Sequence, residues 1–242
     1  RILEATRNAG VELTEGFAAT THEMDLHTVF HPEPAIGNGY SLLALHLEHR
    51  PASPMTDSLV HQLTVVQRAD GSWAWNLPRP PIQSGDIAAT ALAVQGLRQY
   101  PMPGRAREFE ARTSNARRWL RKANPESVEE RAYQLLGLAW SGESHGSLRP
   151  FTDALLATQN PDGSWSQLPK LPGDAYGTGL AMYALLSGGG VPARDAAIQK
   201  GVAFLLRTQL EDGTWHVERR AFPFQPPMDS GFPHGADGWI SA

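Results

Sequence analysis

The sequence Gln159-Asn160-Pro161-Asp162-Gly163-Ser164-Trp165 decides the fold, because the chain contains it three times. Residues 67–73 read Gln-Arg-Ala-Asp-Gly-Ser-Trp, and residues 209–215 read Gln-Leu-Glu-Asp-Gly-Thr-Trp. The shared form is Gln-x-x-Asp-Gly-Ser/Thr-Trp, and each copy follows an apolar helical segment. Asp-Gly favours a turn, because Asp can bond its own backbone and Gly accepts a positive φ. We predict that each copy is a turn between two helices, and we call the copies at 67–73, 159–165 and 209–215 clamps 1, 2 and 3.

The two ends of each clamp suit a contact between helices. The Gln amide can hydrogen-bond the end of a neighbouring helix, and the Trp ring can pack over the Gln amide and the next helix. One active site would not require three copies of the same pattern, so the repetition indicates a structural role. We therefore expect Trp73, Trp165 and Trp215 to be structural, substantially buried and each stacked near its own Gln.

The clamps resemble the QW motif of the squalene cyclase and terpenoid cyclase family. Three full copies between helices make the resemblance specific, and it covers most of the chain, less strongly before Met55. It implies an all-α fold, an α/α toroid (α/α barrel) of repeated helix hairpins in which inner helices ring a central cavity. Fold and chemistry remain separate questions, since one fold hosts many functions.

The remaining helices follow from apolar spacing and from Pro and Gly. The predicted inner helices are 36–49, 86–99, 127–140 and 174–186, with another beginning at Trp239. Further helices are predicted at 57–67, 105–122, 148–159 and 191–209, with an extended connector at 77–81 and a degenerate clamp at 123–126. A first helix over 1–21 is expected to be interrupted near Gly10 and Gly16, before an irregular segment over 21–34. This gives about ten helices in five pairs, whereas the related toroids close with six.

The composition suits a folded domain with a sizeable core. The chain has 242 residues, of which 41% are hydrophobic, and a repeat array favours one continuous domain over residues 1–242. The chain begins with Arg1 and stops inside a predicted helix at Ala242. We therefore expect it to be a piece of a longer protein whose other parts are its partners.

Charge and cysteine content argue against several functions. The net charge is −4 with no basic stripe, which argues against a nucleic-acid partner. Without cysteine, the chain can form no disulfide, thiolate nucleophile or thiolate zinc site. No apolar run reaches the length of a transmembrane helix.

Three of the predicted inner helices share the pattern of their first residues. Asp86-Ile87-Ala88-Ala89-Thr90 aligns with Asp174-Ala175-Tyr176-Gly177-Thr178, and the segment from Asp237 to Ser241 fits the same frame. An Asp opens each helix, and a hydroxyl follows four residues later on the same face. These Asp residues either cap the helices or ring a pocket, and the two roles are compatible. We predict a site at these helix starts, with candidate catalytic residues Asp86, Asp174 and Asp237.

Aromatic and hydroxyl side chains near the same helix starts are candidates for ligand binding. The aromatic rings could line a cavity and stabilise a cation, or they could pack between helices. In a closed ring, equivalent helix starts meet at one mouth of the cavity, where the helix N-termini favour polar or anionic groups. The candidate ligand-binding residues are Tyr40, Thr90, Tyr133, Tyr176, Thr178 and Trp239.

The acid of the cyclase family stands in an Asp-x-Asp-Asp-Thr-Ala motif, which the segment 86–91 resembles. Ala88 and Ala89 occupy the positions of the protonating carboxyl group and its neighbour. Protonating an alkene needs an unusually strong acid, so we expect no proton-initiated cyclisation at these positions. No Asp-Asp-x-x-Asp motif supports magnesium-assisted ionisation of a diphosphate, and the zinc-binding Cys of the prenyltransferase relatives is absent. We predict no cofactor.

Three residues near the N-terminus have a spacing that would suit a metal site. Glu23, His27 and His31 would share one face of a helix at i, i+4 and i+8. However, His31 precedes Pro32, which disfavours the helical conformation. We therefore interpret the segment as a polar surface loop and predict no metal.

Three functional hypotheses remain. The first is a cyclase-like domain that binds an isoprenoid or another apolar small molecule, either without cyclisation or with a relocated acid. The second is a carbohydrate-active enzyme, a lyase or hydrolase, because α/α toroids also host those. The third is a non-catalytic scaffold or interaction module. An aromatic and Leu-lined pocket favours the first, an open groove with paired carboxylates and Arg the second, and a filled centre the third.

Overall fold

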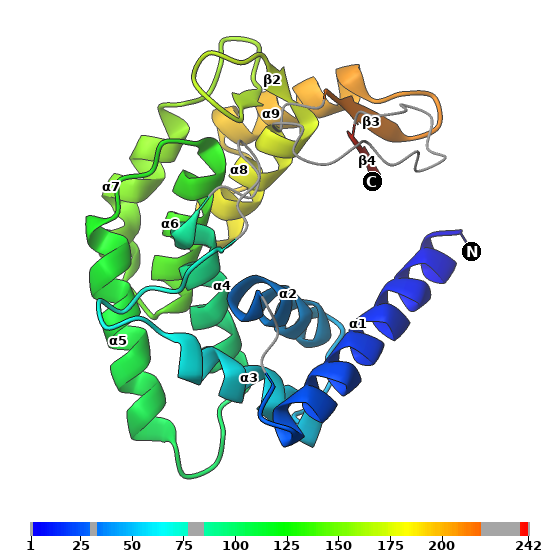
Figure 1. The fold of residues 1–242 in the computed structure, drawn as a ribbon. Helices are drawn as coiled ribbons and strands as arrows, with labels where there is room; N and C mark the ends of the chain where they lie inside the picture. The colour runs from blue at the N-terminus through cyan, green and yellow to red at the C-terminus, as the bar shows by residue number, and fades with distance from the viewer. Residues whose placement is uncertain (1, 30–32, 77–84, 219–237, 242) are drawn as a thin grey trace. The chain divides into compact units, whose positions relative to one another are not determined.

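The structure is a computed structural model that describes residues 2–29, 33–76, 85–218 and 238–241. Its described residues are mostly helical, with nine helices that pack as hairpins and two pairs of short strands (Figure 1). The chain divides into two compact units. Unit 1 comprises Arg1–Leu77 and Gly85–Ala123, and unit 2 comprises Pro78–Ser84 and Asn124–Ala242. The toroid itself stays a prediction.

Unit 1 holds the first five helices, which pack around one buried inner helix. α4 packs against α2, α3 and α5, and all its residues from Ile87 to Leu97 are buried. Gly39 and Gly96 let α2 and α4 approach closely, because a Cβ at Gly39 would lie 2.7 Å from the Cβ of Leu92. The helices are α1 (Ile2–Leu26), α2 (Pro34–Leu47), α3 (Pro54–Val66), α4 (Asp86–Gln99) and α5 (Ala106–Lys122).

The first helix differs from its prediction. α1 continues through Gly10 and Gly16 to Leu26, so the expected interruptions and the irregular segment from Thr21 are wrong over this range. A single Gly costs a helix only about 1 kcal/mol. α1 packs along α3, and the buried Ala18 and Thr21 keep the helix regular through its second half.

Unit 2 repeats the hairpin arrangement. α6 packs against α7 and α8, and α8 packs against α9. Ser127 begins α6 with a capping box, in which its hydroxyl accepts from the Glu130 backbone N–H and Glu130 bonds back to the Ser127 N–H. The helices are α6 (Val128–Trp140), α7 (His145–Leu156), α8 (Ala175–Ser187) and α9 (Ala196–Thr208).

Short strands in unit 2 are the departure from a purely helical fold. β1 (Trp165–Ser166) pairs antiparallel with β2 (Gly173–Asp174), which places Trp165 opposite Asp174. β3 (Thr214–Val217) pairs antiparallel with β4 (Gly238–Ser241). The predicted inner helix beginning at Trp239 is therefore wrong over 238–241, because the backbone there pairs with the strand that follows the clamp 3 turn.

The clamps have the predicted turn, and they use the same bonds at equivalent positions. In clamp 2 the Gln159 amide donates to the carbonyl of Gly163 (3.0 Å) and to that of Ala197 on α9 (2.8 Å). The Trp165 indole donates to the Leu155 carbonyl on α7 (3.1 Å). Clamp 1 repeats both contacts with α5 and α3, and clamp 3 repeats the turn bond and the indole bond. Each clamp thus joins the helix before it to its turn, and clamps 1 and 2 also reach a later helix.

Burial of the clamp tryptophans follows the prediction for two of the three copies. The side chains of Trp73 and Trp165 are 0% exposed, whereas Trp215 is only half-buried. The expected stacking of each Trp on its own Gln stays a prediction.

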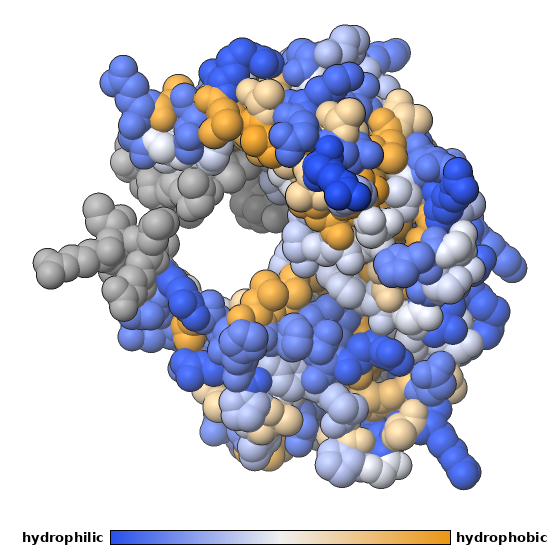
Figure 2. Space-filling view, turned by 180° about the vertical axis from the view of Figure 1, so that it is seen from behind, coloured by the Kyte–Doolittle hydropathy of each residue, from blue (hydrophilic) through white to orange (hydrophobic). Residues whose placement is uncertain are grey.

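The face of the molecule drawn in Figure 2 is mostly hydrophilic, with smaller apolar areas between the polar side chains.

The clamp aspartates make stability depend on acidity. The Asp162 carboxylate accepts from the hydroxyl and the backbone N–H of Ser164, and these bonds hold the pKa of Asp162 below its usual value. In clamp 1 the backbone N–H and the hydroxyl of Ser72 likewise lower the pKa of Asp70. A group with a lowered folded pKa stabilises above its unfolded pKa and loses that contribution as the pH falls.

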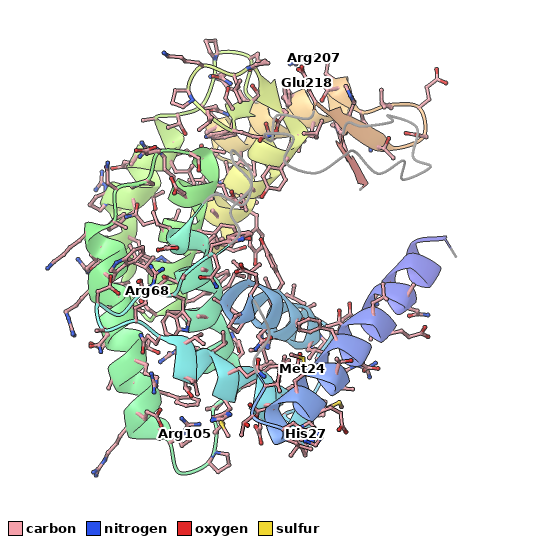
Figure 3. All side chains as sticks on the ribbon, in the orientation of Figure 1. Met24, His27, Arg68, Arg105, Arg207 and Glu218 are labelled. Atoms are coloured by element: carbon pink, nitrogen blue, oxygen red, sulfur yellow. The ribbon has the colours of Figure 1, made fainter. Side chains whose placement is uncertain are left out.

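We expect the Asp70→Asn/Asp162→Asn variant to show a flatter dependence of stability on pH below about 5, since the unfolded carboxylates titrate near 3.9. Asn keeps the acceptor oxygen of the turn but cannot titrate. Urea midpoints measured at several pH values check this. Hydrogen bonding to Arg105 (labelled in Figure 3) lowers the pKa of Glu108 from 4.5 to about 2, so the variant should retain the contribution of Glu108, which is lost as the pH falls between those two values. Parallel curves for the variant and the natural protein would contradict the prediction.

Candidate functional site

The starts of α6 and α8 lie together in unit 2, and Gln167, two residues after clamp 2, joins them. Asp174 caps α8, because its Oδ1 accepts the Gly177 backbone N–H at 2.7 Å. Its Oδ2 accepts a hydrogen bond from the side-chain N–H of Gln167 at 2.5 Å. The backbone carbonyl of Gln167 accepts the Val128 backbone N–H at 3.1 Å. Gln167 therefore bridges the two helix starts, and Asp174 is 7% exposed.

A second carboxylate lies at the same place. The Tyr176 hydroxyl on α8 donates to Glu129 Oε1 on α6 at 3.1 Å, and Glu129 is only 2% exposed. Glu129 stands two residues after the cap Ser127, as Tyr176 stands two residues after the cap Asp174. The sequence analysis missed Glu129 because it aligned only the helices that open with Asp. The Ser-x-x-Glu capping box at 127–130 was the signal that could have found it.

Asp86 has a different environment in unit 1. The cap of α4 is Gly85, so the Asp86 side chain does not cap its helix. Asp86 Oδ1 accepts the Trp75 backbone N–H at 2.9 Å, and Oδ2 forms an ion pair with Arg68 at 2.5 Å. Arg68, labelled in Figure 3, comes from clamp 1. Both carboxylate oxygens of Asp86, a candidate catalytic residue, are therefore engaged as acceptors. Asp237, the third candidate, lies outside the described residues.

The two candidate threonines are placed inside the fold. Thr90 and Thr178 are each 0% exposed. Their hydroxyls accept the backbone N–H groups of Trp73 and Trp165, both at 3.0 Å. Each threonine thus attaches a clamp to its inner helix and offers no exposed surface to a ligand.

The candidate aromatic residues divide by exposure. Tyr133 on α6 is 6% exposed and packs in the core, whereas Tyr40 on α2 is 37% exposed. Tyr176 is half-buried at the start of α8. Trp239 lies in β4, and its side chain is outside the description. The structure brings together only Asp174 and Tyr176 from the predicted site within unit 2, with Glu129 and Gln167 as additions.

An apolar stripe runs along α8 from Tyr176. Helix α8 has no charged residue, and its buried side faces α6, α7 and α9. The remaining side is half-buried or exposed, with Tyr183 40% and Leu186 39% exposed, and a Cβ at Gly179 would meet nothing within 4 Å. We call this surface the α8 stripe, formed by Tyr176, Gly179, Leu180, Tyr183 and Leu186.

Helix α2 in unit 1 carries a surface of the same kind. It has no acidic residue and no Lys or Arg, yet Tyr40 is 37% and Leu47 60% exposed. These two residues are seven positions apart, which places them on one face of the helix.

Histidines near the N-terminus serve to attach α1 to α3. His22 bonds the Ser58 hydroxyl at 2.8 Å, and His61 bonds Asp25 at 2.9 Å. Within the described ranges, no group of three or more His, Cys, Asp or Glu side chains is placed to hold a metal ion. His31, the third residue of the Glu23, His27 and His31 trio, lies outside those ranges.

A scan against protein-family models finds no model that matches the chain. None of the helices in the described part of the chain is long and apolar enough to cross a membrane. The function is therefore inferred from the clamps, the helix starts and the α8 stripe.

Proposed function

We propose that this chain is a squalene cyclase-like repeat domain that binds an isoprenoid or another apolar ligand along its inner helices, without proton-initiated cyclisation. The observation that carries the proposal is the α8 stripe. A helix without charged residues is normally buried all round. Here Tyr183 and Leu186 stay about two-fifths exposed on a helix whose other faces are packed.

The helix starts add a polar end to this apolar surface. Tyr176 is the first residue of the stripe, and its hydroxyl bonds the buried Glu129 carboxylate. An elongated apolar molecule could lie along α8 with one end near this pair. Burying apolar surface contributes about 25 cal/mol per Å², so the stripe supplies the main part of the affinity.

The residues at the start of α4 support the absence of cyclisation. Ala88 and Ala89, at the positions of the family's acid, are 1% and 0% exposed and carry no carboxyl group. The neighbouring Asp86 uses both oxygens to accept hydrogen bonds. A group that protonates an alkene must instead donate from one of its oxygens.

The proposal is tested by binding and product analysis. We expect farnesol, a linear isoprenoid alcohol, to bind, and a Tyr183→Ser/Leu186→Ser variant to bind about tenfold or more weakly because it loses apolar contact. Leu206→Ser is the matched control, since Leu206 is 68% exposed on α9 and lies outside the stripe. Incubation with squalene should give no cyclic product.

Two results would overturn the proposal. A cyclic product from squalene that Asp86→Asn abolishes would show a proton-initiated cyclase that uses Asp86. Farnesol binding that is absent, or that is equally weakened by Leu206→Ser, would remove the α8 stripe as a ligand surface and favour a scaffold role.

A further inference from the structure

A small polar hollow lies beside clamp 2, between the start of α6 and the loop after α7. Its volume is about 190 Å³, and it shares no residue with the α8 stripe. This is below the roughly 300–1,000 Å³ of sites for drug-sized ligands, so it has room for one small ring. Five polar side chains and two apolar ones line it: Glu126, Arg131, Thr158, Asn160 and Ser166, with Val128 and Pro169.

The two charged groups of the hollow are available to a ligand. Within the described part of the chain, no hydrogen bond or ion pair engages the Glu126 carboxylate or the Arg131 guanidinium. Both residues bond through their backbones: the Glu126 N–H donates to the Glu130 carboxylate, and the Arg131 N–H donates to the Ser127 carbonyl. An acceptor and a donor of opposite charge thus line one hollow without neutralising each other.

The neutral groups add further donors and acceptors. Ser166 Oγ accepts from the Asn160 amide at 2.9 Å, which leaves the Ser166 O–H free to donate. Both N–H groups of that amide are used, on Ser164 and Ser166, so Asn160 offers its oxygen as an acceptor. The Thr158 hydroxyl donates to the Leu155 carbonyl and can accept.

We propose that this hollow binds a single sugar ring. Each sugar hydroxyl both donates and accepts, so neighbouring hydroxyls match a lining that combines carboxylate, guanidinium, amide and hydroxyl groups. The exposed Pro169 offers an apolar surface to the C–H face of the ring. A simple anion fits less well, because Glu126 would repel it, and a zwitterion would use the two charged groups but not the hydroxyl and amide groups of the hollow.

The experiment is a titration of the full chain with D-glucose, followed by backbone amide NMR. We expect saturable shifts at Val128, Arg131 and Ser166, with a dissociation constant in the millimolar range. Arg131→Gln and Glu126→Gln should each weaken binding about tenfold, because a hydrogen bond to a charged group is lost. Arg149→Gln is the matched control, since Arg149 is 81% exposed on α7 and away from the hollow.

Glycine and sodium phosphate serve as competing probes of a zwitterion and an anion. Saturable shifts with either probe but not with glucose would overturn the sugar assignment. Glucose shifts that fail to saturate, or that Arg149→Gln weakens as much as Arg131→Gln, would overturn it too. Glucose binding does not depend on the α8 stripe, so the Tyr183→Ser/Leu186→Ser variant should bind glucose as the natural protein does.

Discussion

Replacing Trp165 with Ala is expected to lower the free energy of unfolding by about 3–5 kcal/mol, the range for large-to-small changes of buried aromatics. Trp165 is 0% exposed, and its indole donates to the Leu155 carbonyl. Its ring also lies against Gly201 on α9, where an added Cβ would come within 3.2 Å of the ring. The variant therefore loses contacts with both helices, and urea unfolding measures the loss.

Trp215→Ala is the matched control. Trp215 makes the same indole bond, to the Leu205 carbonyl at 2.8 Å, but its side chain is only half-buried. We expect a clearly smaller loss, because less apolar surface leaves water when Trp215 packs. Equal losses in the two variants would show that the indole bond, and not burial, governs the stability of the clamps.

Gly163→Ala is expected to lower the free energy of unfolding by about 2–5 kcal/mol. Gly163 has φ +91°, and left-handed backbone costs an L-residue roughly 1–2 kcal/mol. A Cβ would also lie 2.5 Å from the Lys200 carbonyl oxygen on α9, and overpacking of this kind costs about 1–3 kcal/mol. The backbone of α9 would have to move, and unfolding in urea again gives the loss.

Gly104→Ala separates the two contributions. Gly104 has φ +80°, but a Cβ there would meet nothing within 4 Å. It should cost only the conformational part, about 1–2 kcal/mol. If Gly163→Ala cost no more than Gly104→Ala, the close approach of clamp 2 to α9 would not constrain the fold.

The parts of the fold that the sequence predicted well are those with local causes. The clamp turns follow from Asp-Gly, and their repetition predicted equivalent contacts in successive hairpins. The bounds of α4 agree with the prediction at 86–99, because Gly85 and the apolar run after it define the start. The continuation of α1 from residue 21 to Leu26 and the strand β4 were missed, because both depend on packing or pairing with residues distant in sequence.

The candidate site was predicted only in part for a related reason. The alignment of helix starts located Asp174 and Tyr176. In the structure Asp174 bonds Gln167, and Tyr176 bonds Glu129. The alignment could not show that the Thr178 hydroxyl accepts the Trp165 backbone N–H. A hydroxyl four residues after the Asp is equally compatible with a residue that lines a pocket and with one that bonds inside the core. Gln167 was not recognisable, because its role depends on the loop that returns from clamp 2 to Asp174.

The Gln159 bond to Ala197 has a consequence for cooperativity. Clamp 2 is attached to α7 through Trp165 and to α9 through Gln159, so it couples two helices that α8 separates in sequence. Clamp 1 couples α3 to α5 in the same way. At these two places a hairpin therefore draws stability from the one that follows it, as in a nearest-neighbour chain. Local opening of α9 removes the second acceptor of Gln159 and uncovers Trp165, so loosening of one hairpin is transmitted to its predecessor.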